Sequence, residues 1–306
     1  MGKLFLLGPQ HAQPTVARVL ASLGARTAAA ITAGWQEREG EPAVLPELGV
    51  PTVELGLHAR AEDVFVSDSE LTAAYKARQT RLRRMQDLYR VRLDRLNQAA
   101  YAIALRHVEP ELLADEAAMS LALVRALDRD HLARCRAVHA AFEQAWPAAE
   151  RPSIARHRRE LAAQLAEADA VVIAGGHVAV LLNRLRLFDL PSLWGERPIL
   201  AWSAGAMALC EQVVLFHDDP PTGAPIAEVL DAGLALVRGL VVLPNPRARL
   251  HLGDRERVAR FAARFDPAPC IALDHGARIE LEGGRVIAGA GNQRLVGDGA
   301  IDRSWP

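Results

Sequence analysis

Residues 199–209 read Ile-Leu-Ala-Trp-Ser-Ala-Gly-Ala-Met-Ala-Leu, and this segment is the most informative of the chain. Its apolar start predicts a buried strand, and the small residues after Ser203 allow a sharp turn into a helix. Ala204 and Gly205 keep bulky side chains out of the turn, and the first amides of a helix have no acceptors of their own. A nucleophile elbow usually reads G-x-S-x-G, whereas Ala201 replaces the first glycine here. The pattern therefore indicates either a nucleophilic serine or an ordinary strand-to-helix turn.

A second strand-to-helix unit precedes this segment. Residues 170–177 read Ala-Val-Val-Ile-Ala-Gly-Gly-His, and helical apolar spacing follows from Val178. Ligands of open α/β sheets bind at the carboxyl ends of the strands, where glycines let backbone amides approach them. We expect Gly175-Gly176 and Ser203 to face one crevice, with the Gly176 and Ala204 amides as an oxyanion hole. The alternative is that the two glycines only form a turn.

The order A-G-G-H followed by W-S-A-G-A resembles the dipeptidase E and cyanophycinase family of serine peptidases, in the class I glutamine-amidotransferase-like superfamily. The resemblance covers residues 170–295 and, more weakly, the first strand at 3–8. It implies an α/β fold with a doubly wound, mostly parallel, flavodoxin-like sheet. It also implies Ser203 as nucleophile and the Gly175-Gly176 turn, with His177, as the oxyanion and substrate site. Cleavage of peptide-type bonds without metal or cofactor would follow.

The chain departs from this family at the general base. Where the family has its catalytic histidine we align Asn245, and an asparagine is no general base near neutral pH. His275 stands where the family has the acidic residue that orients the histidine. His275 is therefore our first candidate for the base, with His251 and His217 as alternatives. A loss of the triad is the remaining possibility.

Two arginines follow Asn245 closely. Arg247 and Arg249 are candidates for bidentate binding of a substrate carboxylate, or else ion-paired surface groups. Two functions remain open: a serine hydrolase of small peptide- or amide-type substrates, and a catalytically impaired family member that binds small molecules or serves as a regulatory or interaction protein. A glutamine amidotransferase is disfavoured because its nucleophile is cysteine, and Cys210 lies seven residues beyond Ser203.

The composition fits a soluble cytoplasmic enzyme. The 306 residues are 50% hydrophobic and carry a formal net charge of −1, so nothing suggests a nucleic-acid or membrane partner. Three scattered cysteines argue against a disulfide framework and favour a reducing compartment. The N-terminus has no signal-peptide pattern, and no apolar run is long enough to cross a membrane. We expect a small-molecule or short-peptide substrate, and a homo-oligomer is possible.

We predict three segments: a first part of the α/β domain at 1–66, a helical insertion subdomain at 67–168, and a second α/β part at 169–306 that ends in a hairpin. In the insertion we expect one helix from residue 71, a second at 112–127, a third that opens at 128–130 and a fourth that opens at 151. A lid or an oligomer contact is its expected use, and its many arginines indicate a solvated face rather than a nucleic-acid site. His131, Cys135 and His139 share one helical stripe, but three ligands over two turns cannot reach one metal ion. We therefore expect no metal site.

Overall fold

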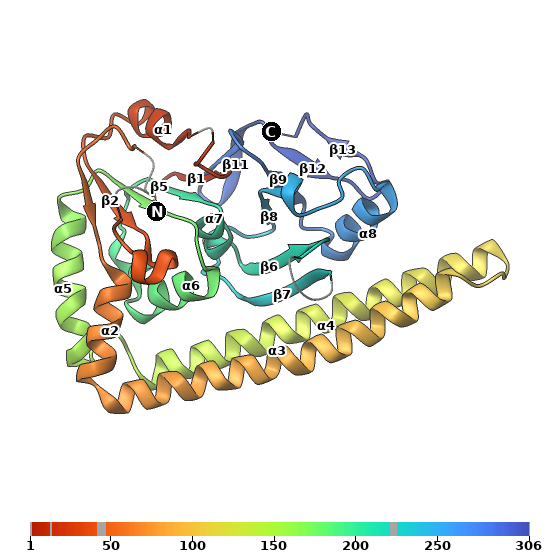
Figure 1. Cartoon of the computed structure of the whole chain (residues 1–306), viewed down its shortest axis with the longest axis horizontal. Coiled ribbons are helices and arrows are strands. Elements are labelled where there is room, and N and C mark those ends of the chain that lie inside the picture. The colour runs from red at the N-terminus through yellow and green to blue at the C-terminus, as the bar shows by residue number, and fades with distance from the viewer. Residues whose placement is uncertain (1, 13, 42–46, 221–224, 306) are drawn as a thin grey trace.

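A seven-stranded sheet forms the centre of the protein (Figure 1). The computed structural model describes residues 2–12, 14–41, 47–220 and 225–305. The sheet has the order β11-β10-β1-β5-β4-β2-β3, in which β1, β5, β4, β2 and β3 are parallel and the β10–β11 hairpin is antiparallel. Its strands are β1 (Leu4–Leu7), β2 (Ala28–Ile31), β3 (Thr52–Glu54), β4 (Ala170–Ile173), β5 (Ile199–Trp202), β10 (Arg278–Glu282) and β11 (Arg285–Ala290). The mostly parallel α/β fold expected from the sequence is confirmed.

Both faces of this sheet are buried. Along β1, Leu4 and Leu6 belong to one apolar cluster, and Phe5 and Leu7 belong to the other, because successive side chains of a strand point to opposite faces. Helix α1 (Val16–Ser22) covers the second face, whereas α2 (Leu57–Ser67), α6 (Val178–Leu187) and α7 (Ala204–Leu209) pack in the first cluster. This double coverage explains why the central strands read as continuous apolar runs rather than alternating ones.

A second sheet lies beside the first. It has the order β13-β12-β9-β8, with strands β8 (Val241–Pro244), β9 (Cys270–Leu273), β12 (Gln293–Leu295) and β13 (Ile301–Asp302). Strand β8 is parallel to β9, and α8 (Arg255–Phe265) connects them. An antiparallel pair, β6 (Gln212–His217) and β7 (Ile226–Ala232), completes the strands of the described residues. The sequence analysis did not predict β6 and β7, and His217, one of the alternative bases, is the last residue of β6.

Two helices of 36 residues each form a long antiparallel hairpin, which we call the arm: α3 (Ser69–Ala104) and α4 (Pro110–Ala145). Asp68 is the N-cap of α3, whose start at Ser69 lies two residues before the expected residue 71, and the Asp68 carboxylate accepts a hydrogen bond from the Leu71 amide at 3.1 Å. The expected start of a new helix at residues 128–130 is wrong. Asp128 lies inside α4 and is buried, and its carboxylate accepts hydrogen bonds from the Tyr89 hydroxyl and the Arg264 guanidinium. Those partners satisfy the side chain, so it does not compete for helix amides.

The helical segment begins earlier than the sequence indicated. The helical insertion was expected from residue 67, but β3 ends at Glu54 and α2 already begins at Leu57, after Gly56 in the left-handed region. Helix α5 (Pro152–Ala166) leads to β4, and the remaining helical turns are η1 (Ala33–Arg38), η2 (Leu190–Leu193) and η3 (Pro246–Ala248). The division at 1–66, 67–168 and 169–306 stays a prediction. Among the described residues, no helix has the length and apolar character needed to cross a membrane.

Candidate active site

Ser203 occupies a strained turn between β5 and α7. Its φ and ψ are 52° and −119°, a region that a residue with a Cβ rarely adopts and that costs about 1–3 kcal/mol. The Ser203 carbonyl accepts the first helical hydrogen bond from the Met207 amide at 3.2 Å. The turn requires Gly205, because a Cβ there would lie 2.5 Å from the Ile173 carbonyl oxygen. Backbone strain at a serine before a helix N-terminus is typical of a functional site.

The Gly175-Gly176 turn lies directly against Ser203. A Cβ on Gly175 would lie 2.9 Å from the Ser203 Cβ and 3.6 Å from both its Oγ and the Ala204 nitrogen. Gly176 has a φ of 106°, and a Cβ there would lie 2.4 Å from the Gly34 carbonyl oxygen. In the hydrogen bonds of the described residues, neither the Gly176 nor the Ala204 amide has an acceptor. The Ala204 amide follows Ser203, and the Gly176 amide belongs to the turn whose Gly175 packs against Ser203, so both are free to bind an anion.

His177 has a structural role in this arrangement. Its amide donates to the Gly34 carbonyl at 2.7 Å, and its Nδ1 accepts a hydrogen bond from the Val180 amide at 3.3 Å. The ring therefore caps the N-terminus of α6. The structure places His177 beside the glycine turn, as predicted, but with its Nδ1 committed to the helix.

The loop after β2 supports the glycine turn from the other side, and it contains a residue that the sequence analysis missed. Gln36 has φ 59° and ψ −121°, nearly the same strained conformation as Ser203. Trp35 lies against Gly176, with its Cδ1 2.8 Å from a Cβ built there. The Glu39 carboxylate in this loop accepts hydrogen bonds from the His58 and Ala59 amides at the start of α2. No sequence signal marks Gln36, because glutamine has no preference for positive φ.

A half-buried carboxyl group lies at the base of this loop. Glu54 Oε1 accepts hydrogen bonds from the Thr32 and Gly56 amides at 3.3 Å each, whereas Oε2 is buried and has no partner within the described residues. Burial, with a smaller contribution from the nearby Glu39 carboxylate, raises the pKa of Glu54 to about 7. The group is therefore partly protonated near neutral pH.

His275 belongs to the same edge of the molecule as Ser203. The Ser203 amide donates to the Leu7 carbonyl, and the next residue, Gly8, is so close to Asp274 that a Cβ there would overlap its carbonyl oxygen. The His275 ring packs edge-on against the His11 ring with centroids 4.6 Å apart. Its Nδ1 is buried without a hydrogen-bond partner among the described residues. No carboxylate orients this imidazole.

The Asp274 carboxylate is already engaged. One oxygen accepts a hydrogen bond from the His275 amide at 3.0 Å, and the other pairs with Arg247 Nε at 2.6 Å. Asn245 sits next to this pair, since its amide donates to the Leu273 carbonyl at 3.0 Å. Asn245 has a left-handed φ of 55° and precedes η3. The ends of β8 and β9 thus bring Asn245, Arg247 and His275 into one loop cluster.

Arg249 differs from Arg247 in its surroundings. The Arg249 guanidinium lies over the Phe216 ring, 5.7 Å from its centroid, and burial lowers the pKa of this side chain. No carboxylate of the described residues pairs with it. Arg249 is an exposed residue, and a cation without an internal counter-ion is available to an acidic ligand.

The two alternative bases lie near β6. The His251 ring pairs with the Asp219 carboxylate, and its amide donates to Asp218 at 2.7 Å. Asp218 is buried and also pairs with Arg257 at 2.7 Å. His217 has a buried Nδ1 without a partner in the described part of the chain. His251 therefore has the carboxylate neighbour that His275 lacks, although the His251 side chain is 54% exposed.

The predicted metal-capable stripe is a packing cluster. His131 stacks on Tyr89 with ring centroids 4.2 Å apart, and His139 pairs with Asp231 at 2.8 Å. Cys135 Sγ lies 3.6 Å from His131 Nε2, and burial raises the pKa of this thiol to about 12. No cluster of three metal-capable side chains occurs among the residues that the structure describes.

The parallel sheet, the strained serine before a helix and the adjoining glycine turn define the α/β class of serine-dependent enzyme folds. Peptidase family S51 matches residues 126–289, which is more than half of the chain, and the chain belongs to this family. The predicted relationship to dipeptidase E and cyanophycinase is thereby confirmed. Among solved structures, the chain is similar to a peptidase from an acI-B1 Actinobacterium, with 15% identity, coverage of 97% of this chain and 91% of that chain, and a TM-score of 0.44. No curated protein matches.

Proposed function

We propose that the chain is a serine hydrolase that cleaves a small peptide- or amide-type substrate through Ser203. The observation that carries the proposal is the strained Ser203 turn, with Gly175 in contact and two free amides beside it. Ser203 Oγ attacks the substrate carbonyl, and the Gly176 and Ala204 amides stabilise the oxyanion that develops. Membership of a serine peptidase family supports this assignment.

His275 is the base that we propose for this step. His275 follows Asp274, which touches Gly8 at the end of β1, and the Ser203 amide bonds to the neighbouring Leu7 carbonyl. The His275 Nδ1 is buried and has no hydrogen-bond partner among the described residues. A general base contributes about 10²- to 10⁴-fold to such a reaction. Because Asp274 pairs with Arg247 rather than with the imidazole, we expect a slower enzyme than one with a complete triad.

Arg249 is the residue that we propose for substrate selection. Arg247 is neutralised by Asp274, whereas Arg249 lies over the Phe216 ring, is exposed and has no internal carboxylate partner in the described residues. A substrate carboxylate would supply that partner through a charge-assisted pair. Peptides with an acidic side chain or a nearby C-terminal carboxylate are therefore the favoured substrates.

A pooled set of short acidic and neutral peptides, followed by mass spectrometry, tests the proposal. We expect the wild type to cleave acidic members, and Ser203→Ala to abolish cleavage. His275→Ala should lower kcat by about 100-fold or more, whereas His251→Ala, the matched control, should change it by less than about threefold. A larger loss in His251→Ala would move the base to that residue.

The second candidate function is a non-catalytic binding protein with the same fold. The observation that favours it is that no carboxylate of the described residues pairs with the His275 ring, together with Asn245 at the position aligned with the family's histidine. If neither peptides nor serine-directed probes react with the wild type, and acidic peptides still bind through Arg249, this second function replaces the first.

A further inference from the structure

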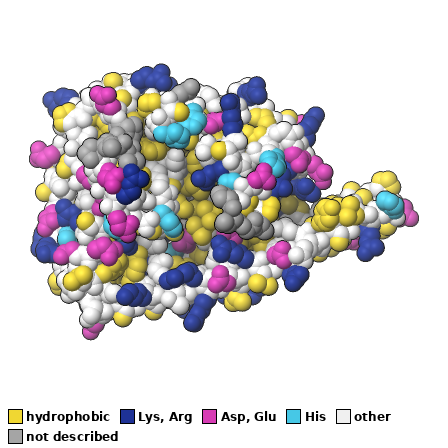
Figure 2. Space-filling model, viewed as in Figure 1, with side chains coloured by type: hydrophobic (Ala, Val, Ile, Leu, Met, Phe, Trp, Pro, Cys, Tyr) yellow, Lys and Arg dark blue, Asp and Glu magenta, His cyan; other side chains and the backbone are white. Residues whose placement is uncertain are grey.

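The arm continues well beyond the body of the protein, and its outer part packs only on itself (Figure 1). No residue between 94 and 119 is buried. Eight of the ten exposed large hydrophobic side chains of the described residues lie on the arm: Leu88, Val91, Tyr101, Leu105, Val108, Leu112, Met119 and Leu123. Figure 2 shows hydrophobic side chains gathered on the protruding end. Exposed apolar clusters of this kind mark interaction surfaces.

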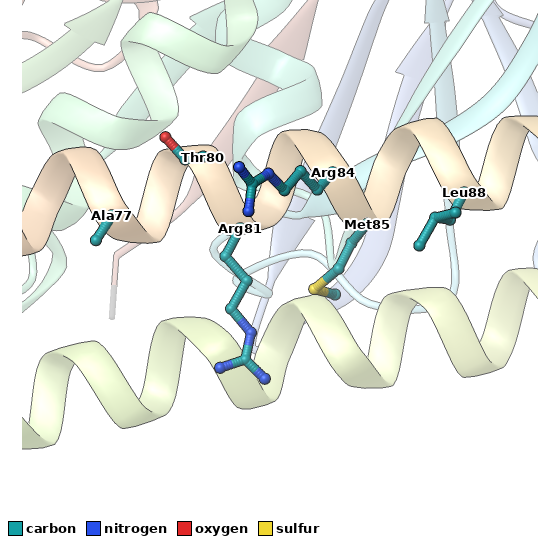
Figure 3. Close-up of a pocket in the computed structure, with 6 residues that line it drawn as sticks. All are labelled: Ala77, Thr80, Arg81, Arg84, Met85 and Leu88. Atoms are coloured by element: carbon teal, nitrogen blue, oxygen red, sulfur yellow. The ribbon is translucent and has the colours of Figure 1, made fainter.

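Two shallow cavities of about 470 and 210 Å³ lie along the arm nearer the body, and they share Arg81 and Met85. We call them together the base groove. Figure 3 shows the part on α3, with the Arg81 side chain extended across α4. The lining combines small or apolar side chains with three arginines: Ala77, Thr80, Arg81, Arg84, Met85, Leu88, Arg134, Ala137, Val138 and Ala141. The base groove is therefore apolar and positively charged.

The tip of the arm has the opposite charge. Helix α4 begins with four acidic residues in eight positions, Glu109, Glu111, Asp115 and Glu116. Leu112, Glu116, Met119 and Leu123 follow one another at spacings of four, three and four, so they form one stripe of the helix. Arg134, Ala137 and Ala141 continue that stripe at the same period into the base groove. One face of α4 thus carries an acidic, apolar end and a basic, apolar end.

We propose that this face binds a second copy of the chain, with the two arms antiparallel and the tip of each in the base groove of the other. Glu116 then faces Arg134 of the second copy, Leu112 faces its Val138, and the twofold axis passes between Leu123 and Leu127. Such an interface is self-complementary, as a twofold dimer requires. The contact is independent of the proposed reaction.

The dimensions suit a stable dimer. The stripe from residue 109 to residue 141 is about 48 Å long at 1.5 Å per residue, and two helices side by side are about 20 Å wide. The face therefore offers on the order of 1,000 Å² per copy, more than the roughly 800 Å² of a standard interface. An antiparallel pair of two-helix hairpins is also a four-helix bundle, which gives the unsupported half of each arm a second layer.

Sedimentation velocity of the full chain, over about a hundredfold range of concentration, tests the proposal. We expect a species of twice the 33.2 kDa chain mass. Glu116→Arg and Arg134→Glu should each raise the dimer Kd by about tenfold or more, because each change places like charges in contact at two symmetric positions. The double variant Glu116→Arg/Arg134→Glu should restore the wild-type Kd to within about threefold.

Arg260→Glu on α8 is the matched control. Arg260 is 58% exposed and pairs with Glu256 four residues before it, as the 48% exposed Arg134 pairs with Asp130. Circular dichroism should show unchanged helix content in every variant. The proposal is overturned if the wild type is monomeric over the whole range, which would leave the groove to another partner. It is equally overturned if Arg134→Glu behaves like Arg260→Glu, or if the double variant fails to restore the dimer.

Discussion

Replacement of Gly175 by alanine adds a single methyl group where the glycine turn touches Ser203. The new Cβ would lie 2.9 Å from the Ser203 Cβ, and such a contact forces one of the two segments to move. Ser203 already occupies a strained backbone conformation, so the displacement falls on the proposed nucleophile. The same Cβ would lie 3.6 Å from the Ala204 nitrogen and crowd the space where an oxyanion is held.

The size of the effect follows from these distances. Overpacking by one methyl group costs about 1–3 kcal/mol, which lowers the Tm of a chain of this size by roughly 2–10 °C. A displacement of the nucleophile by a few tenths of an ångström to 1 Å costs up to about 100-fold in rate. We therefore expect Gly175→Ala to remain folded but to react about 10- to 100-fold more slowly with a fluorophosphonate probe.

Gly253→Ala is the control for this prediction. A Cβ at Gly253 has no atom within 4 Å, and its φ does not lie in the left-handed region, so the variant should keep the wild-type Tm and labelling rate. The probe reaction is followed by in-gel fluorescence against time, and the Tm by differential scanning fluorimetry. Equal labelling rates in Gly175→Ala and Gly253→Ala would refute the contact between the glycine turn and the serine.

Further predictions concern stability. Asp128→Ala should lower the free energy of unfolding in urea by about 3–5 kcal/mol, because it leaves the buried Arg264 without its carboxylate. Asp130 is exposed, and Asp130→Ala, the control, should change the free energy of unfolding by less than about 0.5 kcal/mol. Ser203→Gly should have a free energy of unfolding about 1–3 kcal/mol higher than that of Ser203→Ala in urea, because only glycine adopts the positive φ without strain. Equal urea midpoints of the two variants would argue against strain at this position. Folding raises the pKa of Glu54. The contribution of this carboxyl group to the free energy of unfolding is therefore fully present below the pKa that it has in the unfolded chain, and it is lost as the pH rises through about 7. The Tm of Glu54→Gln minus the Tm of the wild type should therefore increase between pH 5 and pH 8. Parallel plots of Tm against pH for the two proteins would contradict the raised pKa of Glu54.

The sequence predicted the backbone turns at Ser203 and at the glycine pair well, because short-range chemistry decides them. A buried strand followed by small residues located the Ser203 turn, and the glycine pair at 175–176 located its neighbour, because only glycine leaves room there. Gly283-Gly284 predicted the β10–β11 turn for a similar reason, since both residues have positive φ.

Features that depend on distant partners escaped prediction. Asp128 reads as a helix start, and only Tyr89 and Arg264 from other elements show why it lies inside one. The strained φ of Gln36 arises from the packing of its loop on the glycine turn, not from its own residue type. Likewise, nothing in the sequence distinguishes Arg247, which pairs with Asp274, from Arg249, which lies over Phe216.

The most direct measurement is the mass of the intact chain after reaction with a fluorophosphonate, followed by peptide mapping of the modified residue. The account predicts one adduct per chain, on Ser203, and none on Ser203→Ala under the same conditions. An unmodified wild type that is fully folded, or an adduct on any other residue, would contradict the assignment of Ser203 as an activated nucleophile.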